Sequence, residues 1–116
     1  MPSEDNEPLQ SIPIDILLVD DHSHVRKILR EVIETHDNLK VVGEATNGEE
    51  AVLLAVALKP AAVIMDVHLP LVNGIAATTL ITTNPFTAVI GLTAGDPHED
   101  EKAMTIAGAA TVIDKG

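Results

Sequence analysis

Short apolar runs alternate with segments of helical periodicity from Ile14 onward, a pattern that predicts strands alternating with helices. The first run, Ile14–Asp20, is almost unbroken Ile, Leu and Val, as expected for a strand buried on both faces. Strands joined through helices run parallel, so one parallel sheet is expected. Its further strands are predicted at Leu39–Ala45, Ala62–Val67, Ala88–Leu92 and around Val112 and Ile113.

The segments between these runs carry helix signals. The first has an apolar stripe that predicts a helix packed on the core. The second helix is expected between Asn47, a capping residue followed three positions later by Glu50, and Pro60, which ends it. The stripe of the first helix consists of Val25, Ile28, Leu29, Val32 and Ile33. The last two helices are predicted at about residues 75–83 and, after Asp96 as N-cap, from Pro97 to about Ala107.

These elements follow the order (βα)₄β and predict a three-layer α/β domain over residues 14–116. Right-handed crossovers favour a flavodoxin-like, five-stranded parallel sheet with strand order 2-1-3-4-5. Met1–Pro13 has little to bury, so we expect a flexible N-terminal arm. The sequence ends where a fifth helix would begin, so we expect a domain truncated before that helix. One face near the fifth strand would then be uncovered, which predicts marginal stability or self-association, for example as a homodimer.

Polar residues follow four of the predicted strands at the point where each strand ends. The carboxyl ends of parallel strands lie at one edge of the sheet, where open α/β folds bind ligands. Three carboxylates, one hydroxyl and one ammonium should therefore meet there. Taken singly, each has an ordinary structural role, such as helix capping for the adjacent acids, and only the combination favours a site. The residues are Asp20, Asp21, Asp66, Thr93 and Lys115.

This combination predicts a phosphorylation site. A carboxylate that ends a buried strand, as Asp66 does, needs compensation for its desolvation and can act as the nucleophile toward phosphorus. Asp21 and Asp66 would hold Mg²⁺, with Asp20 acting through water. Lys115 would add positive charge, and Thr93 would donate a hydrogen bond to a phosphoryl oxygen. We therefore expect the protein to act as a phosphorylation switch rather than as a turnover enzyme.

Composition narrows the class of protein. The chain has 116 residues, 46% of them hydrophobic, which fits one globular domain. The net charge of −11 argues against a nucleic-acid surface on this chain. No cysteine is present, so disulfides and thiolate metal sites are excluded. No apolar run is long enough to cross a membrane and no secretory signal is visible, so we expect a soluble, cytoplasmic protein.

The segments ILLVDDHSHVR and VVGEATNGEEA, with the strand-end residues above, resemble the receiver domain of two-component response regulators over Ile14–Gly116, and most closely its NarL/FixJ-type subgroup. The resemblance implies that Asp66 accepts a phosphoryl group from a sensor histidine kinase. It also implies that the carbonyl of His68 is the remaining Mg²⁺ ligand. An output domain, usually DNA-binding, would follow beyond Gly116.

Several positions depart from the family pattern. Val112 stands where the family has Tyr or Phe, so the aromatic readout of the threonine cannot operate in its usual form. Gly116 replaces the common proline after the lysine. His68 and Gly95 occupy loop positions that tune phosphate lifetime in the family. His22 is expected to be solvated rather than to bind a metal.

Two other classes of protein remain open from the sequence. A hydrolase of the haloacid dehalogenase type also uses a nucleophilic aspartate, but it needs a D-x-D pair where this chain has Asp20-Asp21-His22. A phosphorylation-independent interaction scaffold on the same fold is compatible with Val112 and with the missing last helix.

Overall fold

The structure is a computed structural model that describes residues 12–94 and 97–115. Its centre is a five-stranded parallel sheet in the order β2-β1-β3-β4-β5, which confirms the predicted strand order. The strands are β1 (Ile14–Val19), β2 (Leu39–Ala45), β3 (Ala62–Asp66), β4 (Ala88–Thr93) and β5 (Thr111–Asp114). The helices of the described residues are α2 (Ser23–Ile33), α3 (Gly48–Leu58), α4 (Gly74–Ile81) and α5 (Pro97–Ala107).

The predicted boundaries differ from these by one or two residues where a strand meets its loop. β1 ends at Val19, and Asp20 begins the turn into α2. β4 continues one residue beyond the predicted Leu92, so Thr93 belongs to the strand and is paired with Asp114 of β5. The predictions for residues 1–11, for Gly95, for the capping residue Asp96 and for Gly116 lie outside the described residues.

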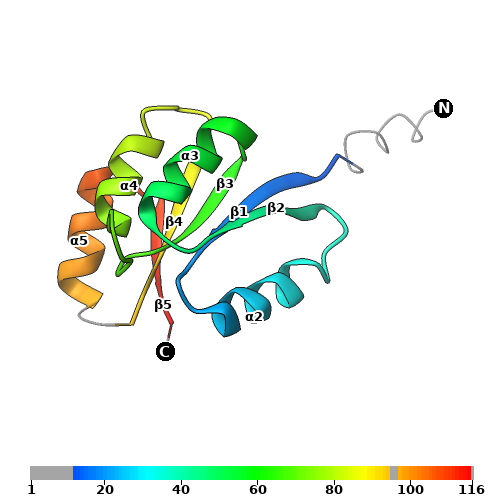
Figure 1. The fold of residues 1–116 in the computed structure, drawn as a ribbon, viewed down its shortest axis with the longest axis horizontal. Helices are drawn as coiled ribbons and strands as arrows, with labels where there is room; N and C mark the ends of the chain where they lie inside the picture. Colours follow the sequence, from blue (N-terminus) through cyan, green and yellow to red (C-terminus); the bar gives the residue numbers. More distant parts are fainter. Residues whose placement is uncertain (1–11, 95–96, 116) are drawn as a thin grey trace.

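Helices lie on both faces of the sheet and make the three predicted layers (Figure 1). α3, α4 and α5 form one layer, in which α4 contacts both of its neighbours. α2 lies on the opposite face, where it packs on β1 and β2. Among the described residues α2 is the helix of that face, so its layer is narrower than the other.

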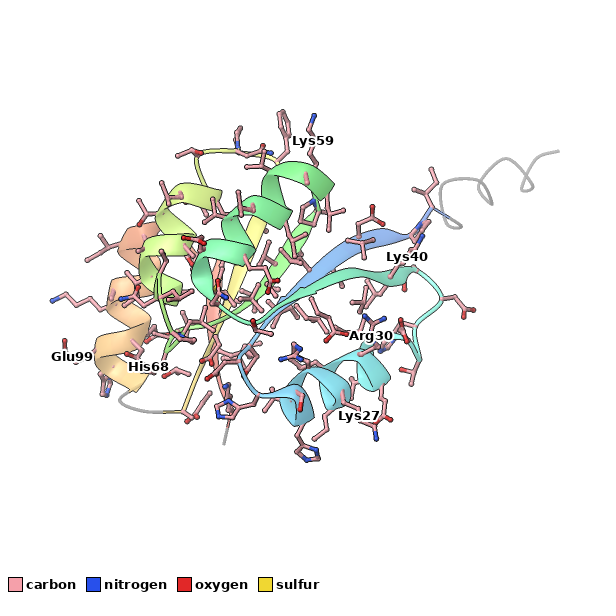
Figure 2. All side chains as sticks on the ribbon, viewed as in Figure 1. Lys27, Arg30, Lys40, Lys59, His68 and Glu99 are labelled. Atoms are coloured by element: carbon pink, nitrogen blue, oxygen red, sulfur yellow. The ribbon has the colours of Figure 1, made fainter. Side chains whose placement is uncertain are left out.

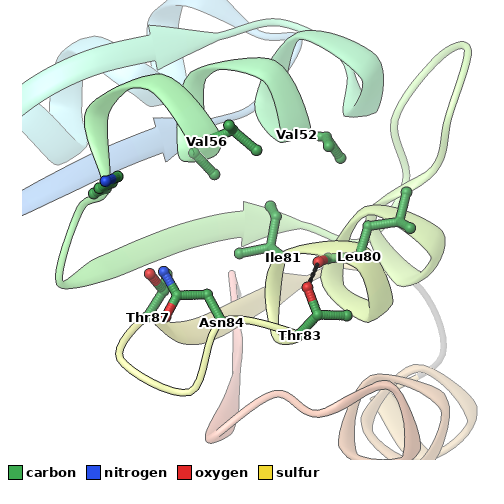
Figure 3. Close-up of a pocket in the computed structure, with 9 residues that line it drawn as sticks. Val52, Val56, Leu80, Ile81, Thr83, Asn84 and Thr87 are labelled. Atoms are coloured by element: carbon green, nitrogen blue, oxygen red, sulfur yellow. Dashed lines mark hydrogen bonds between the residues drawn. The ribbon is translucent and has the colours of Figure 1, made fainter.

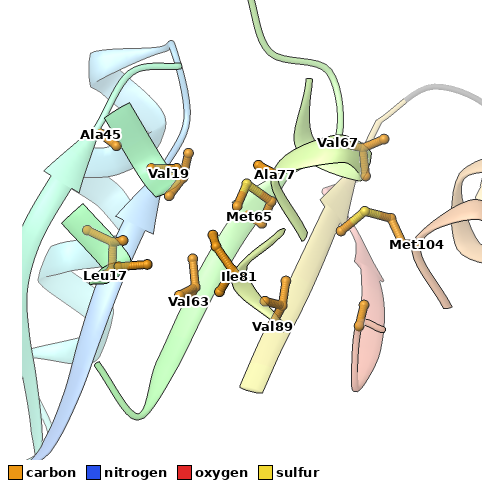
Figure 4. Packing of buried hydrophobic residues seen from close by; sticks show 13 residues of the cluster. Leu17, Val19, Ala45, Val63, Met65, Val67, Ala77, Ile81, Val89 and Met104 are labelled. Carbon is orange, nitrogen blue, oxygen red and sulfur yellow. The ribbon is translucent and has the colours of Figure 1, made fainter. Parts of the chain in front are cut away.

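The larger part of the core lies between the sheet and the α3–α5 layer (Figure 4). Alternate residues of each strand point to that side, as the period of two in a strand requires. The buried members from the strands are Leu17, Val19, Ala45, Val63, Met65 and Val89, and the helices add Ala51, Ala55, Ala77, Ile81 and Met104. A smaller cluster on the α2 side contains Ile16, Leu18, Ile33 and Val41. The continuous apolar runs of the sequence are thus explained by burial on both faces.

The α2 face is incompletely covered near the carboxyl ends of β4 and β5. An apolar groove of about 330 Å³ separates the helix from the sheet there, with Ile28 on one wall and Leu92 and Ile113 on the other. Ile113 is 51% exposed, as expected from the sequence for an uncovered face near the fifth strand. The expectation that the whole apolar stripe of α2 packs in the core was wrong, because Ile28 and Val32 are exposed and only Ile33 is buried.

Asparagine side chains cap two helices of the α3–α5 layer. Asn47 accepts a hydrogen bond from the Glu50 backbone N–H at 2.8 Å, as predicted. The Glu50 carboxylate reaches back to the N–H of Thr46, one residue before the cap, which is a variant of the capping box. Asn73 caps α4 through the N–H of Ala76, so the Asn73-Gly74 pair begins a helix. None of the helices in the described ranges is long and apolar enough to span a membrane.

Candidate functional site

The ends of β1, β3, β4 and β5 bring their polar residues together at one edge of the sheet. Asp20 and Asp66 are buried, with exposed fractions of 0% and 3%. The Lys115 ammonium lies between them, with Nζ 2.8 Å from Asp20 Oδ2 and 3.4 Å from Asp66 Oδ1. The backbone N–H of Lys115 also donates to the carbonyl of Thr93 at 2.6 Å. Residues 95 positions apart in the chain thus form one charged cluster.

The pKa values of the two buried carboxylates are shifted in opposite directions. Burial raises the pKa of Asp66, the neighbouring Asp20 carboxylate raises it further, and Lys115 and the His68 N–H offset this only in part. Burial also acts to raise the pKa of Asp20, but hydrogen bonds from Lys115 and from His22 outweigh it, so this pKa is lowered. Lys115 therefore stabilises the charged form of Asp20, and the charge of Asp66 is compensated less completely.

The pKa of Lys115 is raised for the complementary reason. Burial acts to lower it, but the hydrogen bond to Asp20 and the charges of both carboxylates outweigh burial. The ammonium is therefore fixed in its charged form at neutral pH. A permanent cation placed beside Asp66 can neutralise part of the charge of an anionic group that approaches this carboxylate.

The same acids offer ligand atoms for a cation. Side-chain atoms of Asp20, Asp21, His22 and Asp66 all lie within 4.8 Å of one another. Carboxylate oxygens are the donors that Mg²⁺ prefers, and the exposed Asp21 leaves one side of the group open to water. The residues present therefore fit a Mg²⁺ ion. The backbone N–H of His68 donates to Asp66 Oδ1 at 3.2 Å, which fixes the loop in which the predicted carbonyl ligand lies.

The His22 side chain is 66% exposed, as expected for a solvated histidine, but its ring also contacts two of the acids. Its Nδ1 lies 3.0 Å from Asp20 Oδ1 and 3.2 Å from Asp21 Oδ1, although the ring remains largely exposed. Its backbone N–H donates to the same Asp20 oxygen at 2.9 Å. His22 is the N-cap of α2 without acting as a side-chain cap, so the ring can turn toward the acids. Only its position directly after two acids could have indicated this contact.

A second residue that the sequence did not indicate is Asp100 in α5. Its carboxylate is buried and accepts a hydrogen bond from the hydroxyl of Thr93. The ring Nε2 of His68 lies 2.9 Å from the same oxygen, and Figure 2 shows His68 beside α5. Thr93 therefore lies at the strand edge with the other site residues, but its hydroxyl is engaged with a helix residue.

The loop after β3 approaches α4 so closely that only glycine fits at the start of this helix. A Cβ on Gly74 would lie 2.0 Å from the carbonyl oxygen of Asp66 and 2.8 Å from Cα of Val67. The backbone N–H of Gly74 donates to the carbonyl of Val67 at 2.9 Å. This contact holds the chain segment directly after the Asp66 carboxylate.

We expect Gly74→Ala to lower the free energy of unfolding by about 2 kcal/mol, because the clash is with backbone that cannot rotate away. Gly43→Ala is the matched control. Its Cβ would meet only side-chain ends, Leu58 Cδ1 at 2.9 Å and Leu17 Cδ1 at 3.3 Å. Urea unfolding followed by circular dichroism measures both variants, and equal losses in the two would contradict the close-approach argument.

Another hollow lies between α3 and α4, away from the charged cluster (Figure 3). It has a volume of about 180 Å³, and Val52 and Val56 of α3 face Leu80 and Ile81 of α4 across it. Thr87, which precedes β4, also lines it, so it opens toward the amino ends of the strands. Lys59 is the titratable residue among its lining residues, so this hollow offers no carboxylate or imidazole.

Comparisons with known proteins identify the family of the chain. Residues 16–116 match the family described as the response regulator receiver domain. The chain is 38% identical over 104 residues to the response regulator GacA of Pseudomonas protegens, covering 89% of this chain and 49% of GacA. It therefore spans about half the length of this curated relative.

Solved structures show the same fold. The response regulator domain of Thermotoga maritima CheB superimposes with a TM-score of 0.83 at 35% identity, covering 89% of this chain and 78% of that one. The CheX-CheY-BeF3-Mg complex of Borrelia burgdorferi gives a TM-score of 0.84 at 28% identity, with 90% of this chain and 80% of that one covered. The family match over residues 16–116, the identity to its relatives and the shared sheet order show that the chain belongs to the response regulator receiver domain family.

Proposed function

We propose that this chain accepts a phosphoryl group on Asp66 from a sensor histidine kinase in a Mg²⁺-dependent reaction, and that phosphorylation switches an output domain or partner. The observation that carries the proposal is the buried Asp66 carboxylate beside Asp20 and the Lys115 ammonium. A carboxylate with incomplete charge compensation at a sheet edge is suited to attack phosphorus.

In the proposed reaction the phosphoryl donor is a phosphohistidine of the kinase. An Asp66 carboxylate oxygen forms a bond to phosphorus while the bond from phosphorus to the donor imidazole nitrogen breaks. The imidazole leaves with the bonding electron pair and takes up a proton. Lys115 lies 3.4 Å from Asp66 Oδ1, where its ammonium can stabilise the charge on the transferring group. The Thr93 hydroxyl would donate to a phosphoryl oxygen of the product.

Asp20, Asp21 and Asp66, together with the carbonyl of His68, would hold the ion. Bound Mg²⁺ supplies positive charge that offsets the repulsion between an incoming phosphate and the acids. The similar Borrelia burgdorferi structure is a complex with BeF3 and Mg²⁺, and we propose the same ion for the present chain. His22 lies close enough to these acids to influence which ion they prefer.

The wider setting of the domain is also a proposal. We assign residues 14–116 to the receiver domain and residues 1–13 to an arm, with an output domain, DNA-binding by family resemblance, beyond Gly116. GacA is about twice as long as the matched region, which supports a further domain in a protein of this kind. We propose a cytoplasmic protein of the NarL/FixJ-type subgroup that acts as a switch rather than a turnover enzyme. A homodimer is the simplest form of self-association through the exposed α2 face.

Chemical phosphorylation tests the proposal directly. The protein is incubated with Mg²⁺ and phosphoramidate, and its intact mass is measured with and without EDTA. We expect the mass of one phosphoryl group to be added only when Mg²⁺ is present. Borohydride reduction converts an aspartyl phosphate to homoserine, and tandem mass spectrometry should place that residue at position 66. Labelling elsewhere, or labelling that EDTA does not prevent, would reject the proposed site.

A phosphorylation-independent scaffold is the second candidate function. Val112 favours it, because this residue packs against the core beside β4 and has no ring or hydroxyl to report on the site. Under this alternative, partner binding measured by calorimetry would be the same for the wild type, for Asp66→Asn and in the presence of EDTA. The haloacid dehalogenase alternative loses its basis, since the family match is to receiver domains and His22 stands at the second acidic position.

A further inference from the structure

The hydroxyl of Thr93 has a partner that the proposed phosphorylation chemistry does not use. Thr93 is 1% exposed at the end of β4, and its Oγ1 donates to Oδ2 of Asp100. Asp100 lies in the first turn of α5 and is 7% exposed, so its carboxylate depends on protein groups rather than on water. A threonine hydroxyl has one proton, and this bond uses it.

A second connection joins Asp100 to the phosphoacceptor. His68 binds at both of its ends, since its backbone N–H donates to Asp66 Oδ1 at 3.2 Å and its ring Nε2 lies 2.9 Å from Asp100 Oδ2. One oxygen of Asp100 thus contacts both Thr93, the last residue of β4, and His68 in the loop that follows β3. The first turn of α5 is tied to the site from two directions.

Val112 on β5 offers no alternative connection between the Thr93 hydroxyl and a helix. Val112 is paired with Gly91 and packs against the core cluster on the α3–α5 side of the sheet. It has no polar atom in its side chain, so it cannot exchange a hydrogen bond with Thr93. The described contact through which a change at the Thr93 hydroxyl reaches a helix is therefore the one with Asp100.

We propose that Asp100 is the positioning residue that holds the Thr93 hydroxyl in the unphosphorylated protein and passes the phosphorylation state of Asp66 to α5. This inference rests on the proposed function. A phosphoryl group on Asp66 is a dianionic acceptor at the same sheet edge, and the single hydroxyl proton can serve the phosphoryl group or Asp100 but not both.

When the Thr93 hydroxyl donates to the phosphoryl group instead of to Asp100, the environment of α5 changes. Of its two contacts with described side chains, Asp100 then keeps the one with the His68 ring, which is 64% exposed, while a new negative charge has been placed on Asp66. A buried carboxylate that has lost a donor and gained a like charge as a neighbour is stabilised by moving toward water. The first turns of α5 should therefore loosen or shift on phosphorylation, and this helix would carry the signal that an aromatic residue on β5 carries in other members of the family.

Hydrogen exchange on α5 tests the coupling at known phosphoryl occupancy. The protein is phosphorylated with phosphoramidate and Mg²⁺, the occupancy is read from the intact mass, and exchange is followed in peptides covering residues 97–107. In the wild type we expect phosphorylation to speed exchange in α5 by about threefold or more. In Asp100→Ala the exchange should already be fast without phosphate, and phosphorylation should add little.

Matched variants separate this role from a purely structural one. Thr93→Val should lose the α5 response and Thr93→Ser, which keeps the hydroxyl, should restore it when samples of equal occupancy are compared. Glu101→Ala removes an exposed acid from the same helix and should leave the response intact. The phosphorylation-dependent difference is the readout, because a structural role alone would change both states equally.

The outcomes distinguish this inference from the function on which it rests. A phosphorylated wild type whose α5 exchange does not change, or a full response in Thr93→Val or Asp100→Ala, would overturn the role of Asp100 and leave the phosphoacceptor intact. A wild type that gains no phosphoryl mass would overturn both.

Discussion

Replacement of Asp66 with asparagine is expected to abolish phosphoryl incorporation and, at the same time, to stabilise the fold in Mg²⁺-free buffer. The amide lacks the nucleophilic oxygen, so no acyl phosphate can form at this position. The stability effect follows from burial, because Asp66 is 3% exposed and shares the site with the charge of Asp20. Removing one negative charge should raise the free energy of unfolding by about 1–2 kcal/mol.

The pH dependence of this gain has a definite sign. The pKa of Asp66 is raised in the folded protein, so the folded state binds a proton more tightly than the unfolded chain does. The cost of the ionised carboxylate is present at neutral pH and disappears as the pH falls through the raised pKa toward the ordinary value of 3.8. The advantage of Asp66→Asn should therefore be largest near neutral pH and should shrink in acid.

Asp37→Asn provides the matched control, since Asp37 is exposed in the turn before β2. Urea unfolding at several pH values measures both variants, and intact mass after treatment with phosphoramidate and Mg²⁺ measures labelling. Mg²⁺ should stabilise the wild type more than Asp66→Asn, because the variant has lost a proposed ligand. A variant that is labelled like the wild type, or that is less stable at neutral pH, would contradict the account of Asp66.

The sequence predicted the charged cluster because each of its members is fixed by a strand end. Asp20, Asp66 and Lys115 follow apolar runs, and the rule that parallel strands end at one edge was enough to place them together. The burial of Asp66 was expected because its carboxylate ends one of these runs. The register, which pairs Asp66 with Leu92, is a detail that the structure adds.

The partners of Thr93 could not be predicted in this way. Asp100 was one of several acids in a helix whose rotation about its axis is set by packing against β4, β5 and α4. Its weak amphipathic pattern did not show which acid would turn inward. The ring of His68 was equally undetermined, because its backbone position in the loop says nothing about which of its two nitrogens meets a partner.

The exposed part of α2 shows a related limit. The apolar stripe gave the correct helix but not the extent of its burial, because burial depends on what covers the same face of the sheet. Ile28 and Val32 are exposed because α2 covers only β1 and β2 in the described structure. The apolar pattern of one helix gives no information on which other elements cover the same face of the sheet.

Lys115→Met should destabilise the protein by about 3 kcal/mol, at the lower end of the roughly 3–5 kcal/mol found when one partner of a buried ion pair is removed. Lys115 is the cation that contacts both Asp20, at 2.8 Å, and Asp66, at 3.4 Å. Methionine has a similar length and keeps the packing of the aliphatic chain, but it takes away the ammonium that contacts both buried carboxylates. The backbone hydrogen bond to Thr93 is retained, so the loss reports on the ammonium.

Two further measurements decide whether the ammonium acts through these acids. Asp20→Asn in the Lys115→Met background should recover a large part of the lost stability, because the double variant has one negative charge fewer. Mg²⁺ should stabilise Lys115→Met more than the wild type, since a cation held by the same acids replaces the missing charge. Lys27→Met, at an exposed position on α2, is the control and should change stability by less than about 0.5 kcal/mol. If Lys115→Met were no less stable than this control, or gained nothing from Mg²⁺, the acids would not depend on Lys115, and the electrostatic basis of the proposed phosphoryl site would be lost.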